Sequence, residues 1–93
     1  MINFDSISTE TLISTTVRKI RGYSYHMKNY IRYVKYNKNQ NDWALERHYA
    51  QLNSLEDCID ILLRELVIRN VTIPNKYMKS YLDNQKKREE TLI

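Results

Sequence analysis

Apolar residues recur at alternating intervals of four and three in two long stretches of this sequence. The first row consists of Ile13, Val17, Ile20, Ser24, Met27, Ile31 and Val34, of which only Ser24 is polar. The second row consists of Leu45, His48, Leu52, Leu55, Ile59, Leu62 and Leu66. This spacing lines one side of an amphipathic or coiled-coil α-helix. The polar segment 37–42 separates the rows, so two helices of roughly 40 Å each should fold back as an antiparallel hairpin.

The helix boundaries follow from residues that begin or end helices. Ser8 or Thr9 can cap the first helix, and Asn41 or Asp42 the second. Pro74 suits the first turn of a third helix. We therefore predict one all-α domain over 1–93, with helices over about 9–37, 42–69 and 75–88. We expect a lead-in over 1–8 and a frayed tail over 86–93. Residues 67–73 alternate as a strand would, but have no partner strand.

Scarce residue types exclude several classes of protein. One glycine and one proline are too few for an all-β fold or for a glycine-rich phosphate loop. A single cysteine, Cys58, can form neither an internal disulfide nor a cysteine-based zinc site. The sequence has no apolar run long enough for a membrane helix, and its first residues do not resemble a secretory signal. We expect a cytoplasmic protein without metal or cofactor.

Positive charge is concentrated in the first helix, and two interpretations of it compete. Residues 11–41 contain seven bases and no acid. A stripe along this helix consists of Arg18, Arg21, Tyr25, Lys28, Arg32 and Lys35. A second basic cluster consists of Lys86, Lys87 and Arg88, together with Lys76 and Lys79. Bases interleaved with tyrosine are typical of a surface that binds nucleic-acid phosphates.

The hairpin offers these bases partners within the chain. Antiparallel pairing about residue 39 would place Arg32 opposite Glu46, Arg21 opposite Asp57 and Arg18 opposite Asp60, with Lys35 near Asp42. We favour this ladder of ion pairs over a free nucleic-acid stripe.

The other flank of the hairpin carries almost no charge and is rich in tyrosine. From the two helices it presents Lys19, Tyr23, His26, Tyr30, Tyr33, Leu55 and Leu62. A short third helix would cover only part of this flank, and contiguous apolar surface marks an interaction site. The flank thus predicts a homodimer, forming a helical bundle, or a docked host protein.

Catalytic signals are weak. The Arg21-x4-His26 spacing resembles the motif of HEPN-type ribonucleases, which implies RNA cleavage. In a helix, however, the two side chains point about 140° apart. We therefore favour the interpretation that they are two ordinary surface residues. His26 and His48 can approach each other across the hairpin, but no further metal ligand converges on them.

The sequence therefore predicts a small non-catalytic protein that oligomerises and occupies a protein partner. The abundance of Asn, Ile, Lys and Tyr indicates an AT-rich genome, so an accessory or inhibitory protein of a phage, plasmid or virus is a plausible role. The alternative is a dimeric nucleic-acid-binding protein that contacts the phosphate backbone through its first helix.

Overall fold

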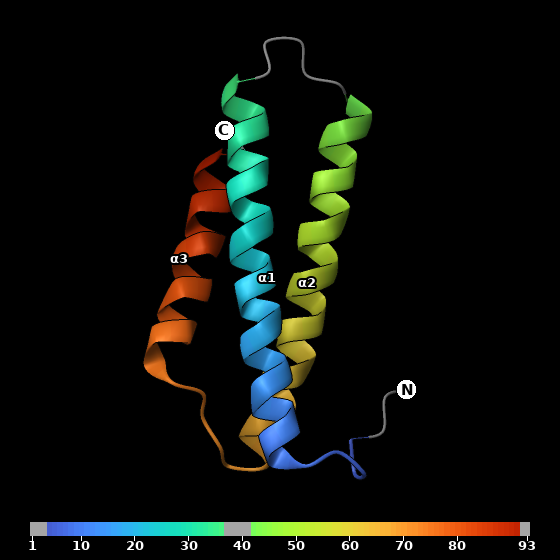
Figure 1. The fold of residues 1–93 in the computed structure, drawn as a ribbon, viewed down its shortest axis with the longest axis vertical. Coiled ribbons are helices and arrows are strands. Elements are labelled where there is room, and N and C mark those ends of the chain that lie inside the picture. Colours follow the sequence, from blue (N-terminus) through green and yellow to red (C-terminus); the bar gives the residue numbers. More distant parts are fainter. Residues whose placement is uncertain (1–3, 37–41, 92–93) are drawn as a thin grey trace.

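Three helices form the protein in a computed structural model that describes residues 4–36 and 42–91. They are α1 (Thr9–Tyr36), α2 (Asp42–Ile68) and α3 (Asn75–Thr91), and the described residues contain no strand. The chain runs up, down and up again, with α1 between the other two helices (Figure 1). The predicted all-α fold is therefore confirmed. The predicted polar turn lies outside the described residues, apart from the start of α2 at Asp42.

The beginning of the first helix is fixed by its capping residue and by Arg69, the residue that directly follows α2. The Ser8 hydroxyl accepts a hydrogen bond from the backbone N–H of Thr11 at 3.1 Å, as an N-cap does. The Arg69 guanidinium donates to the carbonyl oxygens of Phe4 at 2.7 Å and Ile7 at 2.8 Å. The lead-in is thus tied to the end of α2.

The end of α2 explains why residues 67–73 are not a strand. Asn70 has a φ of 60°, in the left-handed region that asparagine tolerates. The backbone N–H of Asn70 bonds to the carbonyl of Val67, and that of Val71 to the carbonyl of Leu66, both at 2.9 Å. This pair of bonds is a Schellman motif, which satisfies the last carbonyls of the helix. The chain then turns through Pro74 into α3.

The core lies on one side of α1, where the two other helices meet it. Its buried apolar residues are Leu12, Ile20, Tyr23, Met27, Tyr30, Leu52, Ile59, Leu62, Leu66, Ile73 and Tyr81. On α1 the buried stripe includes both tyrosines, whereas Ile13, Ile31 and Val34 of the predicted row are only partly buried. The predicted row was therefore displaced toward one edge of the true core.

The third helix continues beyond the predicted limit of residue 88. α3 ends at Thr91, and Arg88 is buried within it. Residues 86–91 are therefore helical, and the expectation of a frayed tail from residue 86 is wrong for them. In the described part of the chain, no helix combines the length and apolar character needed to cross a membrane.

Candidate nucleic-acid interface

A groove between α1 and α3 carries most of the cations that the chain brings together. It consists of two adjoining hollows of about 400 and 430 Å³ that share Ser24, Lys28, Lys76 and Ser80. Its charged lining residues are Arg21, Lys28, Lys76, Lys79, Asp83 and Lys87. We call this the α1–α3 groove. Five bases and one acid line it, so its charge is strongly positive.

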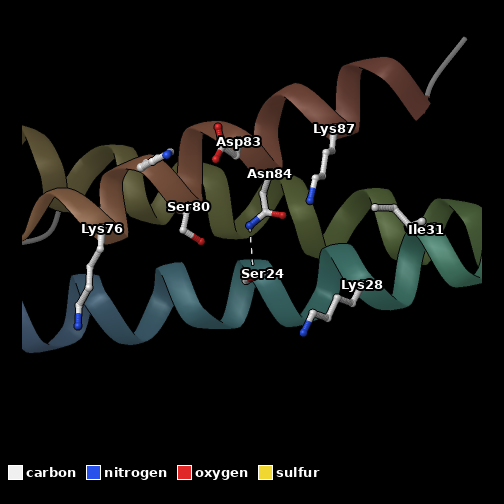
Figure 2. Close-up of a pocket in the computed structure, with 9 residues that line it drawn as sticks. Ser24, Lys28, Ile31, Lys76, Ser80, Asp83, Asn84 and Lys87 are labelled. Atoms are coloured by element: carbon white, nitrogen blue, oxygen red, sulfur yellow. Dashed lines mark hydrogen bonds between the residues drawn. The ribbon is translucent and has the colours of Figure 1, made fainter.

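Helix geometry explains this convergence. α1 and α3 run in the same direction, and Asn84 Nδ2 donates to Ser24 Oγ at 3.2 Å between them (Figure 2). Along the two helices, Lys76 lies to one side of this hydrogen bond, and Lys28 and Lys87 lie to its other side (Figure 2). Lys76 and Lys87 are eleven residues apart, close to three helical turns, so they lie on the same side of α3.

The cations of the groove make no ion pairs within the described residues. The ion pairs there join Arg69 to Glu65 and Arg88 to Glu56, both outside the groove. Arg21 instead donates to the Tyr77 hydroxyl at 3.2 Å. Partial burial acts to raise the pKa of Tyr77, but the positive charges of Arg21 and Lys76 outweigh it and lower the pKa. The lowered pKa of Tyr77 thus reflects the positive potential of the groove.

The predicted ladder of ion pairs between α1 and α2 is absent from the described residues. Glu46, Asp57 and Asp60 are exposed, and none of them lies within ion-pair distance of Arg32, Arg21 or Arg18. The side chain of Asp42, the expected neighbour of Lys35, lies outside the described residues. The reason is that α2 packs on the side of α1 that carries Tyr23, and Arg21 lies about 160° away from it around the helix. The bases of α1 therefore stay available to an external anion.

Three of the seven residues of the tyrosine flank are buried. Tyr23 and Tyr30 are 0% and 1% exposed, and Leu62 is also buried. The remaining residues of that flank are half-buried; they are Lys19, His26, Tyr33 and Leu55. The flank is therefore covered in part, since Tyr23 packs against Tyr81 of α3, with ring centroids 5.3 Å apart, and Tyr30 packs against Tyr49 of α2.

The basic residues predicted to contact phosphate differ in their exposure and in whether they line the groove. Arg88 cannot contact an external phosphate, because it is buried, with Nη1 3.0 Å from Glu56 Oε2 and Nη2 donating to Asn53 at 2.6 Å. The other predicted cations on α1 and α3 are exposed; they are Arg18, Arg21, Lys28, Arg32, Lys35, Lys86 and Lys87. Of these, Arg21, Lys28 and Lys87 line the groove. Lys76 and Lys79, which the sequence placed in the second basic cluster, also line the groove, although the sequence did not identify the helix that faces them.

A separate hollow, outside the α1–α3 groove, lies between α1 and α2. It has a volume of about 360 Å³ and is lined by Tyr25, His26, Asn29, Trp43, Ala44, Arg47, His48 and Gln51. We call it the α1–α2 hollow. Burial, with the charges of His26 and Arg47, lowers the pKa of His48. Arg21 and His26 line different hollows, so the two residues of the ribonuclease-like motif do not converge.

No protein-family model matches this sequence, and searches among curated proteins and solved structures found no significant similarity. The described residues hold no cluster of three histidine, cysteine or carboxylate side chains that could bind a metal. Functional interpretation therefore depends on the chemistry of the surface.

Proposed function

We propose that the protein binds nucleic acid by contacting phosphates in the α1–α3 groove. The observation that carries this proposal is the convergence of Arg21, Lys28, Lys76, Lys79 and Lys87 beside a single acid. Cations gathered without acidic partners in ion pairs attract a polyanion and release its condensed counterions on binding. The net charge of +4 acts in the same direction.

The dimensions of the groove suit a stretch of phosphate backbone. The rise of an α-helix places Lys76 and Lys87 about 16 Å apart along α3. One strand of B-DNA presents a phosphate every 3.4 Å along the axis, so this length spans roughly four or five phosphates. Lysine contacts of this kind position a protein without specifying a base sequence.

Salt dependence is the direct test. A fluorescent oligonucleotide is titrated with the protein, and binding is followed by anisotropy at 50 and 200 mM salt. Three or four phosphate contacts would weaken binding to duplex DNA roughly 40- to 150-fold over this range. Undetectable binding to DNA and RNA at the lower salt concentration would refute the proposal.

Matched double variants locate the contact surface. Lys28→Gln/Lys87→Gln removes two charges from the groove, and we expect it to reduce the salt slope by about two. The control, Lys35→Gln/Lys86→Gln, removes the same net charge from exposed lysines that do not line the groove. Equal losses in the two variants would show that net charge alone determines binding.

A second surface favours a dimer, although not through the tyrosine flank by which the sequence predicted one. Where the end of α2 meets the beginning of α3, Val67 and Ile68 are 75% and 76% exposed. Beside them lies an apolar hollow of about 250 Å³ whose lining includes Leu66, Val71 and Met78. We call this surface the apolar edge. Water contact with so much aliphatic side chain is unfavourable, which favours burial in an interface.

Charge complementarity selects a second copy of this chain as the occupant. Asp60 and Arg64 border the apolar edge one helical turn apart, and neither makes an ion pair within the described residues. When two copies of α2 pack antiparallel about a twofold axis, Asp60 of each copy faces Arg64 of the other. This register places Leu63 of each copy between the two pairs and Val67 and Ile68 toward the ends of the interface.

Solution mass tests the dimer. Light scattering after size-exclusion chromatography should give twice the mass of 11.3 kDa for the wild type and the monomer mass for Val67→Glu. Tyr36→Glu is the control, because Tyr36 is comparably exposed, at 69%, and lies near the opposite end of the hairpin. A monomeric wild type at about 100 µM would overturn the dimer and leave phosphate binding unaffected.

A further inference from the structure

The α1–α2 hollow adjoins the cationic groove through one residue. Tyr25 lines both the α1–α3 groove and the α1–α2 hollow, and it is 64% exposed. A strand whose phosphates lie in the groove therefore passes beside the opening of the hollow. Trp43, at the far side of this hollow, is 63% exposed.

The lining of this hollow has the chemistry needed to hold a nucleobase. Tyr25 and Trp43 offer two aromatic rings on which a base can stack. The guanidinium carbon of Arg47 lies 5.1 Å from the Trp43 ring centroid, which keeps positive charge beside that ring. The amides of Asn29 and Gln51 provide both donors and acceptors for the edge of a base. The volume of about 360 Å³ is within the range of small-molecule sites.

We infer that the α1–α2 hollow takes an unpaired base, so that the protein prefers single-stranded to duplex nucleic acid. This inference rests on the proposed phosphate binding in the α1–α3 groove. The bases of a duplex are stacked on one another and cannot enter a lateral hollow without being flipped out. A single strand can turn a base toward Tyr25 and Trp43 while its phosphates remain in the groove.

The only tryptophan of the chain reports directly on this site. The experiment titrates the protein with a single-stranded oligonucleotide of about 12 nucleotides and with the corresponding duplex, as DNA and as RNA. We expect the single strand to quench the fluorescence of Trp43, because a base stacks on its ring, and the duplex to leave the fluorescence nearly unchanged. Binding measured by anisotropy should be tighter for the single strand.

A pair of tyrosine variants separates stacking from a general loss of aromatic surface. Tyr25→Leu should weaken single-strand binding about 5- to 100-fold and leave duplex binding nearly unchanged. Tyr36→Leu is the matched control, since Tyr36 is 69% exposed on the same helix but does not line the hollow. Both variants replace exposed residues, so both should fold as the wild type does.

The outcomes distinguish this inference from the proposal on which it rests. Equal binding of single strand and duplex with unchanged Trp43 fluorescence would overturn the base site and leave phosphate binding intact. Equal effects of Tyr25→Leu and Tyr36→Leu would also overturn the base site. Failure to bind either form of nucleic acid would overturn the proposed function, and the base site with it.

Discussion

Three tyrosines of the core have raised pKa values because their phenol groups are buried. The Tyr23 hydroxyl donates to Glu56 at 2.5 Å, and burial together with this contact raises the pKa of Tyr23. Burial, with the neighbouring Tyr49, raises the pKa of Tyr30 to about 12. Burial, with the charges of Asp60 and Glu56, raises the pKa of Tyr81. Ionisation of each of these phenols is therefore less favourable in the folded core than in water.

These shifts predict a loss of stability in alkali. The unfolded chain releases phenolic protons near pH 10, whereas the folded protein retains them, so above that pH the unfolded state binds fewer protons. The free energy of unfolding should fall from about pH 10 until the folded phenols ionise, near 12 for Tyr30. Each tyrosine contributes up to about 1.4 kcal/mol per pH unit. Urea denaturation from about pH 8 to 11.5 measures the decline.

Tyr30→Phe is the variant that assigns this effect. It removes one buried phenol and keeps the ring, so the decline in alkali should become shallower. An unchanged slope would show that Tyr30 ionises equally readily in the folded and unfolded states.

Gly22 is a second residue whose surroundings decide the effect of a substitution. It lies within α1, has no positive φ, and a Cβ atom placed on it would meet no atom within 4 Å. Gly22→Ala should therefore raise the free energy of unfolding by about 0.5–1 kcal/mol, because alanine loses less backbone freedom on folding. Denaturant melts measure the gain. The reverse change at an exposed helical site, Ala50→Gly, should lower the free energy of unfolding by a similar amount. A destabilising effect of Gly22→Ala would contradict this prediction.

At the scale of elements, a polar network fixes α3 across the hairpin. Arg88 of α3 contacts Glu56 and Asn53 of α2, and Glu56 also accepts the hydroxyl of Tyr23 from α1. One carboxylate thus joins all three helices. The sequence predicted the existence of α3 from Pro74, but not this network. Arg88 stood within a run of bases next to glutamates, and nothing in that local pattern distinguished a buried arginine from an exposed one.

Neutralising Glu56 should loosen the third helix. Glu56→Gln leaves the buried guanidinium of Arg88 without its counter-charge, so we expect a loss of about 2–3 kcal/mol in the free energy of unfolding. The control is Asp57→Asn, which removes the same charge from the next residue, an exposed side chain without an ion pair in the described residues. Its effect should stay within about 0.5 kcal/mol. Equal losses would mean that the pair contributes nothing specific.

At the scale of the whole molecule, α1 is the helix on which both others depend. It lies between α2 and α3 and contacts both, and the molecule measures 47 × 28 × 18 Å (Figure 1). This flat arrangement buries the middle of α1 most completely. It also leaves a cationic groove on one margin of α1 and an aromatic hollow on the other.

Hydrogen exchange should reveal this hierarchy. Backbone amides near Tyr23 and Met27 are expected to exchange only on global unfolding, because both side chains are 0% exposed in the centre of α1. Amides of α3 should exchange faster, after correction for intrinsic rates, because one side of that helix faces water. Uniform protection of the three helices would contradict an assembly around α1.

The sequence by itself determined the helices, their order and the hairpin, because apolar spacing, caps and a single proline act locally. It also located the cations of α1. Only the tertiary structure decided which side of α1 each partner helix covers. A rotation of about 100° per residue separates neighbouring positions on a helix, so a displacement of the apolar row by one residue moved Tyr23 and Tyr30 from surface to core. The same choice left Arg21 and Lys28 facing α3, where Lys76 and Lys87 complete the groove.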